Sequence, residues 1–329
     1  MIENLLAHGI WVAILFIIVG FIALVKGADC LVDGASAVAK RFGISDLVIG
    51  LTVVAFGTSM PEFVVNMVSV GEGSTELAIT NILGSNIINT LVILGITALV
   101  FPIASQKRSR HFDIPFSNLA GILVLVFVLI EMPFGETGKG IGRMGGIILL
   151  LLFGWFLFST FRHAKAHPEE AEGESVKKMS NTKAIVFILL GFIGLIIGGE
   201  LIVKSAVDIA YRCGVGEAII GLTVVALGTS LPELATSVIA ASKKNSDIAL
   251  GNVIGSNIFN VFFVLGTSAT VRPLPAYDGI EVDACVATLG SAIVWLAVMT
   301  DKEKKIQRWA GALLLIVYGG YLTYRLMTI

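Results

Sequence analysis

Two glutamates lie deep inside strongly apolar stretches of this chain. Glu62 and Glu233 each follow the start of an apolar run by about fifteen residues. An ionisable side chain at the middle of a bilayer costs about 2.5–3.5 kcal/mol on insertion scales, so a matched pair needs compensation. An internal salt bridge is one alternative, but its candidates, Lys26 and Lys204, lie near the ends of their runs. The pair therefore favours a bound cation as the compensating charge.

The residues that precede each glutamate add further oxygen atoms. Glu62 ends the segment GTSMPE and Glu233 ends the segment GTSLPE. The threonine and serine precede the glutamate by four and three positions, so we expect both hydroxyls on the carboxylate's helix face. The proline lacks an N–H and frees a main-chain carbonyl one turn earlier, so each helix is expected to break here. Freed carbonyls are tolerated at this depth only where protein or a cavity satisfies them. The four hydroxyl residues are Thr58, Ser59, Thr229 and Ser230.

The next apolar run in each half carries polar residues at four-residue spacing. Such a stripe often serves as packing contact between membrane helices, and a ligand role is the alternative, which the nearby glutamates favour. Asn86 and Asn257 lie about 100° away around the helix and are expected to hydrogen-bond between helices. The two stripes are Asn81, Ser85 and Asn89, and Asn252, Ser256 and Asn260.

All of these candidate ligands are hard oxygen donors, which suit Na⁺, Ca²⁺ or Mg²⁺ rather than zinc or copper. Calcium accepts six to eight oxygens in flexible geometry, whereas Mg²⁺ gives up its water reluctantly. Two carboxylates match the charge of one Ca²⁺, and replacing that ion with three Na⁺ would make exchange electrogenic. Two interacting acids can also share a proton, so H⁺ stays an alternative driving ion.

The elements that must position these residues are membrane-spanning helices. The chain is 56% hydrophobic and only 14% charged, which excludes a soluble enzyme or a disordered chain. A spanning helix needs about 20 mostly apolar residues. Ten runs meet this requirement: 10–40, 47–70, 77–100, 114–131, 144–161, 184–211, 217–241, 248–271, 284–299 and 306–327. We therefore expect an all-α polytopic membrane protein with ten transmembrane helices.

An internal repeat organises these runs. The segment 50–62 (GLTVVAFGTSMPE) returns at 221–233 (GLTVVALGTSLPE) with 11 of 13 positions identical. Equivalent residues of the two copies are separated in the sequence as position 50 is from position 221. We call this separation the repeat offset, and it covers five spans. Five is an odd number, so the second copy enters the membrane from the opposite side. Two inverted five-helix repeats are the architecture of many secondary transporters, whose sites lie near the midplane. We expect the first repeat over 1–161 and the second over 184–329.

Lysine and arginine set the expected orientation, because cytoplasmic loops carry an excess of both. The loops after the odd-numbered spans hold 16 of these residues and the opposite side holds 5. This asymmetry predicts that both termini lie outside and that the linker 162–183 is cytoplasmic. We expect a multi-pass protein of the plasma (inner) membrane whose partners are the lipid bilayer and its ions.

Other functional classes lack support in the sequence. An intramembrane hydrolase with Ser59 or Ser230 as nucleophile would need an arginine or another oxyanion-stabilising group nearby, and no arginine lies between Phe42 and Gln106. A net charge of −1 without a basic face argues against nucleic-acid binding. One central site without a multi-site filter favours a transporter over a channel. We therefore expect no enzymatic activity and no cofactor.

With these motifs in view, the chain resembles the calcium/cation antiporter superfamily, which contains the sodium/calcium exchangers and their bacterial relatives. The resemblance rests on GTSxPE and GSNIxN in each half and on the spacing between them. It implies a ten-helix inverted-repeat fold with alternating access, which exchanges Ca²⁺ for Na⁺. The ligand set that it implies is Glu62, Glu233, Thr58, Ser59, Thr229, Ser230, Ser85, Asn89, Ser256 and Asn260, with main-chain carbonyls at Ala55 and Ala226.

One position departs from part of that superfamily. Potassium-dependent exchangers and some prokaryotic relatives carry an aspartate where this chain has Asn260. Asparagine makes the two halves alike and argues against potassium dependence. Within the same fold, exchange of Ca²⁺ or another divalent cation for H⁺ is the alternative to sodium-driven exchange.

Overall fold

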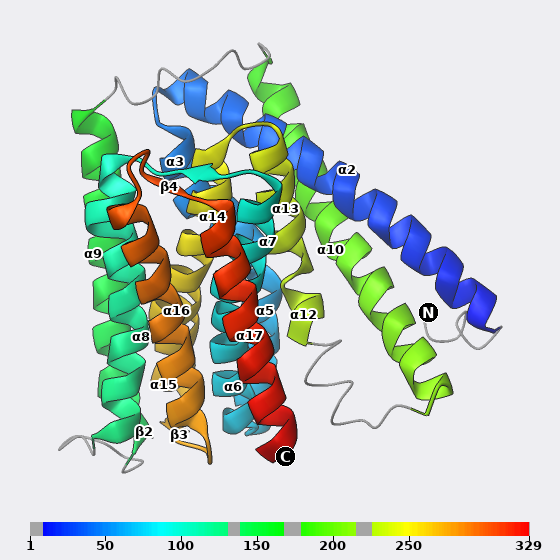
Figure 1. Cartoon of the computed structure of the whole chain (residues 1–329), viewed down its shortest axis with the longest axis vertical. Helices are drawn as coiled ribbons and strands as arrows, with labels where there is room; N and C mark the ends of the chain where they lie inside the picture. Colours follow the sequence, from blue (N-terminus) through cyan, green and yellow to red (C-terminus); the bar gives the residue numbers. More distant parts are fainter. Residues whose placement is uncertain (1–8, 131–138, 168–178, 215–225, 329) are drawn as a thin grey trace.

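The computed structural model describes residues 9–130, 139–167, 179–214 and 226–328 as a bundle of long helices with four two-residue strands (Figure 1). Helices marked η are π-helical turns. In chain order the elements are α2 (Ile10–Phe42), α3 (Asp46–Ile49), η1 (Gly50–Val54), α4 (Ala55–Thr58), α5 (Met60–Glu72), α6 (Thr75–Ile87), η2 (Ile88–Ile93), α7 (Leu94–Val100), β1 (Ile103–Ala104), η3 (Ser109–Asp113), α8 (Ile114–Leu129), β2 (Gly140–Ile141), α9 (Arg143–Ala166), α10 (Asn181–Arg212), α12 (Ala226–Thr229), α13 (Leu231–Ser242), α14 (Ser246–Ile258), η6 (Phe259–Leu265), α15 (Gly266–Val271), β3 (Leu274–Pro275), α16 (Ile280–Thr300), β4 (Lys305–Ile306) and α17 (Arg308–Thr328).

The prediction of an all-α polytopic membrane protein is confirmed. Within the described ranges, eight helices are long and apolar enough to cross a membrane, and the bent pair Asp46–Thr58 and Met60–Glu72 adds a ninth span. The remaining expected span, 217–241, begins in residues outside the described part of the chain. Its described portion is formed by α12 and α13.

The repeat found in the sequence is also a repeat of structure. The pairs α2 and α10, α5 and α13, α6 and α14, and β1 and β3 each begin at positions related by the repeat offset. The members of each helix pair run in opposite directions through the bundle, as the colour gradient shows for α2 and α10 (Figure 1). The two halves therefore have the inverted relation that an odd number of spans predicts.

Two short antiparallel ribbons connect the halves at opposite ends of the bundle. β1 pairs with β4 through Ile103 and Ile306, and β2 pairs with β3 through Ile141 and Leu274. Each ribbon joins a strand from the first half to a strand from the second half. We call the two ends of the bundle the β4 end and the β3 end, after these strands (Figure 1).

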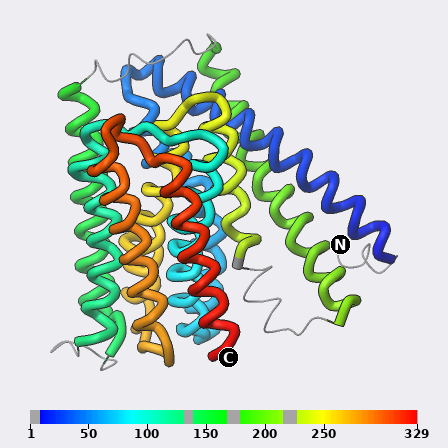
Figure 2. Tube along the Cα trace, in the orientation of Figure 1, coloured from blue at the N-terminus to red at the C-terminus, as the bar shows by residue number. Residues whose placement is uncertain are grey.

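Helices α2 and α10 form a long antiparallel pair that is tilted against the other helices (Figure 2). Glycines allow their backbones to touch: a Cβ on Gly20 would lie 2.8 Å from the carbonyl oxygen of Gly198, and one on Gly27 would lie 2.9 Å from that of Gly191. Small residues at a membrane helix interface permit this close approach. Gly43, in the left-handed region at φ 62°, ends α2.

The centre of the bundle is formed by the two continuous spans that follow the broken helices. The most apolar windows of Thr75–Val100 and Ser246–Val271 are 83% and 94% buried, against 22% for α2. A helix that is buried on all sides can keep polar side chains away from lipid. These two spans, with the broken helices beside them, hold the candidate site.

Candidate cation site

Both GTSxPE segments interrupt their helices, as the sequence predicts. The chain leaves helical geometry at Ser59 (φ −87°, ψ 7°) and at Ser230 (φ −91°, ψ 6°). Pro61 and Pro232 then stand in the first turn of the next helix, where a missing N–H removes no hydrogen bond. In the first half, the two helical pieces are bent by 46°. The breaks expose main-chain groups in the interior of the bundle.

The two glutamates follow these breaks and are buried. Glu62 is 1% exposed and Glu233 is 0% exposed, each in the first turn of its helix. They are near enough for their carboxylates to repel each other. Among the described residues, no lysine, arginine or histidine forms a salt bridge with either one, and Lys204 pairs with Glu200 at 2.8 Å. The internal salt bridge considered from the sequence is therefore not seen in this part of the chain.

Three of the four hydroxyl side chains on the broken helices interact with the glutamate of the opposite half. Ser59 Oγ donates to Glu233 Oε1 at 3.0 Å, and Thr58 also interacts with Glu233. In the other direction, Thr229 interacts with Glu62. The expectation that each hydroxyl pair shares a face with its own glutamate was wrong, because the break ends the helical periodicity on which it depended. The site is consequently built from both halves.

The second helix of each half supplies a serine to its own glutamate. Ser85 on α6 interacts with Glu62, and Ser256 on α14 interacts with Glu233. Both serines are almost completely buried. Each carboxylate therefore has a serine from its own half and hydroxyl oxygen from the other half beside it.

Several buried oxygens at this centre make no hydrogen bond within the described part of the chain. A buried polar atom without a partner is costly, and in native proteins it commonly marks an ion or water. Carbonyl and carboxylate oxygens of this kind can accept a cation directly. The atoms are Glu62 Oε2, Glu233 Oε2, Ser230 Oγ, Asn89 Oδ1 and Asn260 Oδ1.

The asparagines away from the stripe connect the two central spans. Asn86 Nδ2 donates to the carbonyl oxygen of Asn257 at 3.2 Å, and Asn257 Nδ2 donates to Thr90 Oγ1 at 2.8 Å. Asn260 Nδ2 donates to Asn86 Oδ1 at 3.0 Å, which leaves its own carbonyl oxygen Oδ1 available. The predicted hydrogen bonding of Asn86 and Asn257 between helices is confirmed.

The first residues of the two stripes serve as packing contacts. Asn81 Nδ2 donates to Asn66 Oδ1 at 3.0 Å, and Asn252 Nδ2 donates to Ser237 Oγ at 2.9 Å. Asn66 also donates to Ser268 Oγ at 3.3 Å. Asn66 and Ser237 are not among the predicted residues, although each follows a glutamate by four residues. That spacing places them on the glutamate's helix face and could have identified them.

The remaining two predicted ligands are main-chain carbonyls. Ala55 begins α4, and its carbonyl accepts from Ser59 N at 3.0 Å and from Thr58 Oγ1 at 3.3 Å. Ala226 begins α12 at the equivalent position, and its side chain lies outside what the structure describes. All twelve predicted residues thus fall on the two broken helices and the two central spans.

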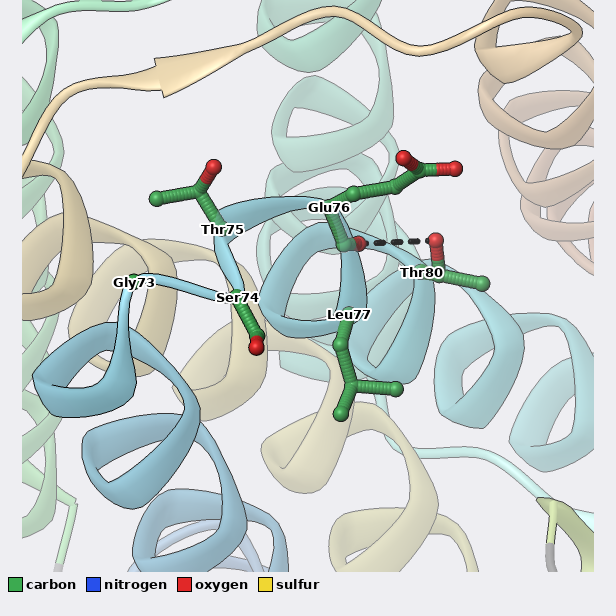
Figure 3. Close-up of a pocket in the computed structure, with 6 residues that line it drawn as sticks. All are labelled: Gly73, Ser74, Thr75, Glu76, Leu77 and Thr80. Atoms are coloured by element: carbon green, nitrogen blue, oxygen red, sulfur yellow. Dashed lines mark hydrogen bonds between the residues drawn. The ribbon is translucent and has the colours of Figure 1, made fainter.

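A surface pocket lies apart from these residues at the β3 end, where α5 turns into α6 (Figure 3). Ser74 and Thr75 are among the residues that line it, and Thr80 Oγ1 donates to the Glu76 carbonyl at 2.8 Å. None of the twelve predicted ligands lines this pocket. In the described residues, no three histidine, cysteine, aspartate or glutamate side chains cluster as a metal site. The central site depends instead on two carboxylates with hydroxyl and amide oxygens.

Comparison with known proteins places the chain among cation exchangers. The family described as sodium/calcium exchanger protein matches residues 12–162 and 183–327. Sodium/calcium exchanger MaX1 of Methanosarcina acetivorans is 32% identical over 95% of this chain and 98% of its own length. Inner membrane protein YrbG of Escherichia coli is 36% identical over 78% of this chain and 79% of its own length.

The fold is similar to that of a solved exchanger. The sodium-calcium exchanger NCX_Mj, soaked without Na⁺ and Ca²⁺, superposes with a TM-score of 0.80 and 32% sequence identity. The match covers 94% of this chain and 97% of that one. Another structure of the same exchanger, soaked with Na⁺ and Sr²⁺, also matches with a TM-score of 0.80.

Proposed function

The chain belongs to the sodium/calcium exchanger family of membrane antiporters, and from that membership we propose that it exchanges Ca²⁺ for Na⁺ across a membrane. The transported ions bind at the centre of the bundle between Glu62 and Glu233. Transport proceeds by alternating access, in which the site opens to one side of the membrane at a time. Calcium and sodium are substrates of this cycle, and the proposal includes no resident cofactor and no catalytic reaction.

One observation carries the proposal: two buried carboxylates interact electrostatically, and the helices that hold them carry further buried oxygens without a hydrogen-bond partner in the described part of the chain. Isolated buried charges are strongly unfavourable, and a divalent cation between two carboxylates neutralises them. Calcium prefers six to eight oxygen ligands, often including carboxylates. In our proposal Glu62 and Glu233 bind Ca²⁺ together with hydroxyls and carbonyls of both broken helices. The further ligands are Thr58, Ser59, Thr229, Ser230, Ser85, Asn89, Ser256, Asn260 and the carbonyls of Ala55 and Ala226.

Charge balance favours an electrogenic cycle. The two carboxylates contribute two negative charges, which one Ca²⁺ cancels. Three Na⁺ in the same site would leave one net positive charge, so each turnover would move charge across the membrane. Alternating occupancy by these ions fits a site whose ligands come from both halves of the chain.

Proton-driven exchange is the second candidate. Glu62 and Glu233 interact electrostatically while buried, and two such acids can share a proton. A proton would relieve the repulsion between the carboxylates when Ca²⁺ leaves. The two candidates differ in whether Na⁺ or a pH gradient drives Ca²⁺ uptake.

We further propose the orientation given by the distribution of lysine and arginine. The β4 end and the linker 162–183 face the cytoplasm, and both termini lie outside. The five-helix units 1–161 and 184–329 form the two inverted repeats. The plasma (inner) membrane is the proposed location, in agreement with the name of the Escherichia coli relative.

Uptake of radioactive Ca²⁺ into proteoliposomes tests the function. Vesicles are loaded with Na⁺ and diluted into Na⁺-free buffer, with wild type, Glu62→Gln, Glu233→Gln and the exposed loop variant Glu303→Gln compared in parallel. We expect Na⁺-dependent uptake in wild type and in Glu303→Gln, and loss of uptake in both site variants. An imposed membrane potential should change the initial rate.

The alternatives give different results in the same assay. Uptake that follows a pH gradient without Na⁺ would replace sodium by protons as the driving ion. Uptake that survives in folded Glu62→Gln and Glu233→Gln would contradict the proposed site. A folded wild-type protein that takes up no Ca²⁺ under either gradient would contradict Ca²⁺ as the substrate.

A further inference from the structure

Three buried asparagines connect the two central spans next to the predicted ligands. Asn86 on α6 and Asn257 on α14 are related by the repeat offset, and Asn260 lies in η6. Their exposed fractions are 6%, 3% and 0%. A side-chain amide carries a carbonyl oxygen at one end and an NH₂ group at the other, so its hydrogen bonds decide which end faces a given direction. Only Asn260 belongs to the predicted ligand set, which leaves the role of the other two amides open.

A main-chain carbonyl fixes the orientation of the Asn86 amide. Asn86 Nδ2 donates to the carbonyl oxygen of Asn257 at 3.2 Å. A carbonyl oxygen only accepts hydrogen bonds, so the NH₂ group of Asn86 must be the end that meets it. The side-chain oxygen of Asn86 is consequently left to accept from another donor, which is Asn260.

The orientation of Asn86 then determines the orientation of Asn260. Asn260 Nδ2 donates to Asn86 Oδ1 at 3.0 Å. Because that oxygen only accepts, Asn260 must turn its NH₂ group toward Asn86 and its carbonyl oxygen away from it. Asn260 Oδ1 is buried and makes no hydrogen bond within the described residues. This order of hydrogen bonds leaves an oxygen, and not an N–H group, to meet a cation.

The repeat does not hold Asn89 in the same way. Asn257, the counterpart of Asn86, donates from Nδ2 to Thr90 Oγ1 at 2.8 Å. The second half has Val261 at the position of Thr90, so this hydroxyl acceptor exists in one half only. A hydroxyl both donates and accepts, and it therefore does not fix an amide as a carbonyl does. The two halves share the motif GSNIxN but hold its last asparagine differently.

We infer that Asn86 is a positioning residue for ion binding, which directs the carbonyl oxygen of Asn260 toward the cation without being a ligand itself. The inference rests on the proposed function, in which Asn260 contributes an oxygen to the bound ion. In metal sites, groups that hydrogen-bond to a ligand fix its orientation. An amide turned the other way would present its N–H groups to the cation and repel it. A residue of the first half thus prepares a ligand of the second half.

Binding of radioactive Ca²⁺ to the full-length protein in nanodiscs tests this role. Asn86→Leu removes the acceptor that orients Asn260, and we expect Ca²⁺ binding to weaken by roughly 2- to 12-fold, the factor that corresponds to one hydrogen bond. Asn86→Ala removes the same acceptor without adding an apolar side chain, and it gives the same comparison if Asn86→Leu does not fold. Asn257→Leu is the matched control. It keeps the main-chain carbonyl that orients Asn86, so it should weaken binding by a smaller factor.

A change at the ligand itself separates orientation from a merely structural role. Asn260→Asp replaces the amide by a carboxylate, whose two oxygens both accept and need no orientation. In that background, Asn86→Leu should no longer weaken Ca²⁺ binding, because either end of the side chain at position 260 is an oxygen. A structural loss would instead weaken binding by the same factor in both backgrounds.

The outcomes distinguish this inference from the proposed exchange function. Wild-type protein that binds and takes up Ca²⁺, with equal weakening by Asn86→Leu in both backgrounds or none in either, would overturn the positioning role and leave the exchanger proposal intact. An equal loss in Asn86→Leu and Asn257→Leu would also overturn it, because both changes would then act through packing. Folded wild-type protein that binds no Ca²⁺ would refute the proposed substrate, and this inference with it.

Discussion

Helices α2 and α10 occupy equivalent positions in the two repeats, yet they meet the rest of the molecule differently. The C-terminal half of α2 is packed into the bundle, whereas that of α10 is half-buried. Helix α10 nevertheless contacts both broken helices, because Phe192 lies against Gly57 and Val203 lies against Gly228. Phe21, the counterpart of Phe192 on α2, is 54% exposed. Two helices related by the repeat can therefore be packed differently within one molecule.

The loops that follow the broken helices show the same difference. Asn245 donates to Asp46 Oδ2 at 2.5 Å and accepts from Ile248 N at 3.0 Å, so it joins α2, α3 and α14 at the β4 end. Its counterpart at the β3 end, Ser74, forms no side-chain cap on α6 and borders the open pocket (Figure 3). The two ends are related by the repeat, but their loops are held by different contacts.

The largest effect is expected from filling the space at the broken helices. A Cβ at position 57 would overlap the Phe192 ring, and one at position 228 would overlap Val203. Overpacking of this kind costs about 1–3 kcal/mol, so Gly57→Ala and Gly228→Ala should each lower the initial rate of Ca²⁺ uptake by roughly tenfold. Uptake in proteoliposomes with matched protein content measures this effect.

Second-site changes make that prediction specific. Phe192→Ala should rescue Gly57→Ala and leave Gly228→Ala impaired, whereas Val203→Ala should do the reverse. Rescue of both variants by the same second change would show that α10 does not contact the two breaks separately.

Accessibility of introduced cysteines should distinguish the two helices directly. In a background that lacks Cys30, Cys213 and Cys285, we expect Ala206→Cys to react with a water-soluble maleimide several-fold faster than Ala35→Cys. The reason is that Ala35 is 0% exposed while Ala206 is half-buried. Labelling rates followed by mass spectrometry provide the measurement. Equal rates would mean that the difference in packing does not persist in the membrane.

A smaller effect is expected when the two loops lose their polar side chains. Asn245→Ala removes a helix cap and a buried contact to Asp46, and it should lower the free energy of unfolding by about 1–2 kcal/mol. Ser74→Ala removes no cap and should change stability by less than about 0.5 kcal/mol. Thermal unfolding in detergent compares the two variants. A larger loss of stability in Ser74→Ala than in Asn245→Ala would contradict this prediction.

The smallest effect concerns alkaline pH at the β3 end. Burial, and then the nearby Asp283 carboxylate, raise the pKa of the Tyr277 hydroxyl above its usual value of 10.0. The folded state thus favours the protonated hydroxyl, so its contribution to stability is complete below pH 10 and is lost as the pH rises further. At the β4 end, the equivalent residue is Gln106, which does not ionise.

Tyr277→Phe is the matched test of that pH dependence. It removes the hydrogen bond of 2.6 Å to Asp283, so it should cost stability at neutral pH. Between pH 9 and about pH 11, its melting temperature should fall less steeply than that of wild type. Parallel slopes for the two proteins would assign the alkaline effect to other groups.

Much of this fold follows from local sequence features, because hydropathy and repeats depend on few long-range details. The apolar runs predict the helices, and the Gly-Thr-Ser and proline pattern predicts the breaks at Ser59 and Ser230. The repeat offset, which spans an odd number of helices, predicts the inverted relation of the halves. Asn86 and Asn257 could be identified as contacts between helices because their angular position separates them from the stripe.

The contacts between a hydroxyl of one repeat and the glutamate of the other repeat could not be predicted in the same way. Arguments from helical spacing assume one straight helix, and that assumption fails at Ser59, whose hydroxyl reaches Glu233 instead of Glu62. The π-helical turns at η1, η2 and η6 also have no sequence signal that we recognised. The difference in burial between the C-terminal halves of α2 and α10 could not be predicted either, since the repeat alone would make the two helices alike.

The ribbons at the two ends also constrain how the molecule is made. Ile103 cannot pair with Ile306 until the ribosome has added the whole stretch of chain between them, which is more than half of the sequence. At about 5–20 residues per second, that interval lasts roughly 10–40 seconds. During this time, the β1 segment has no partner strand. The first half of the chain is therefore joined to the second at this ribbon only after α16 has been synthesised.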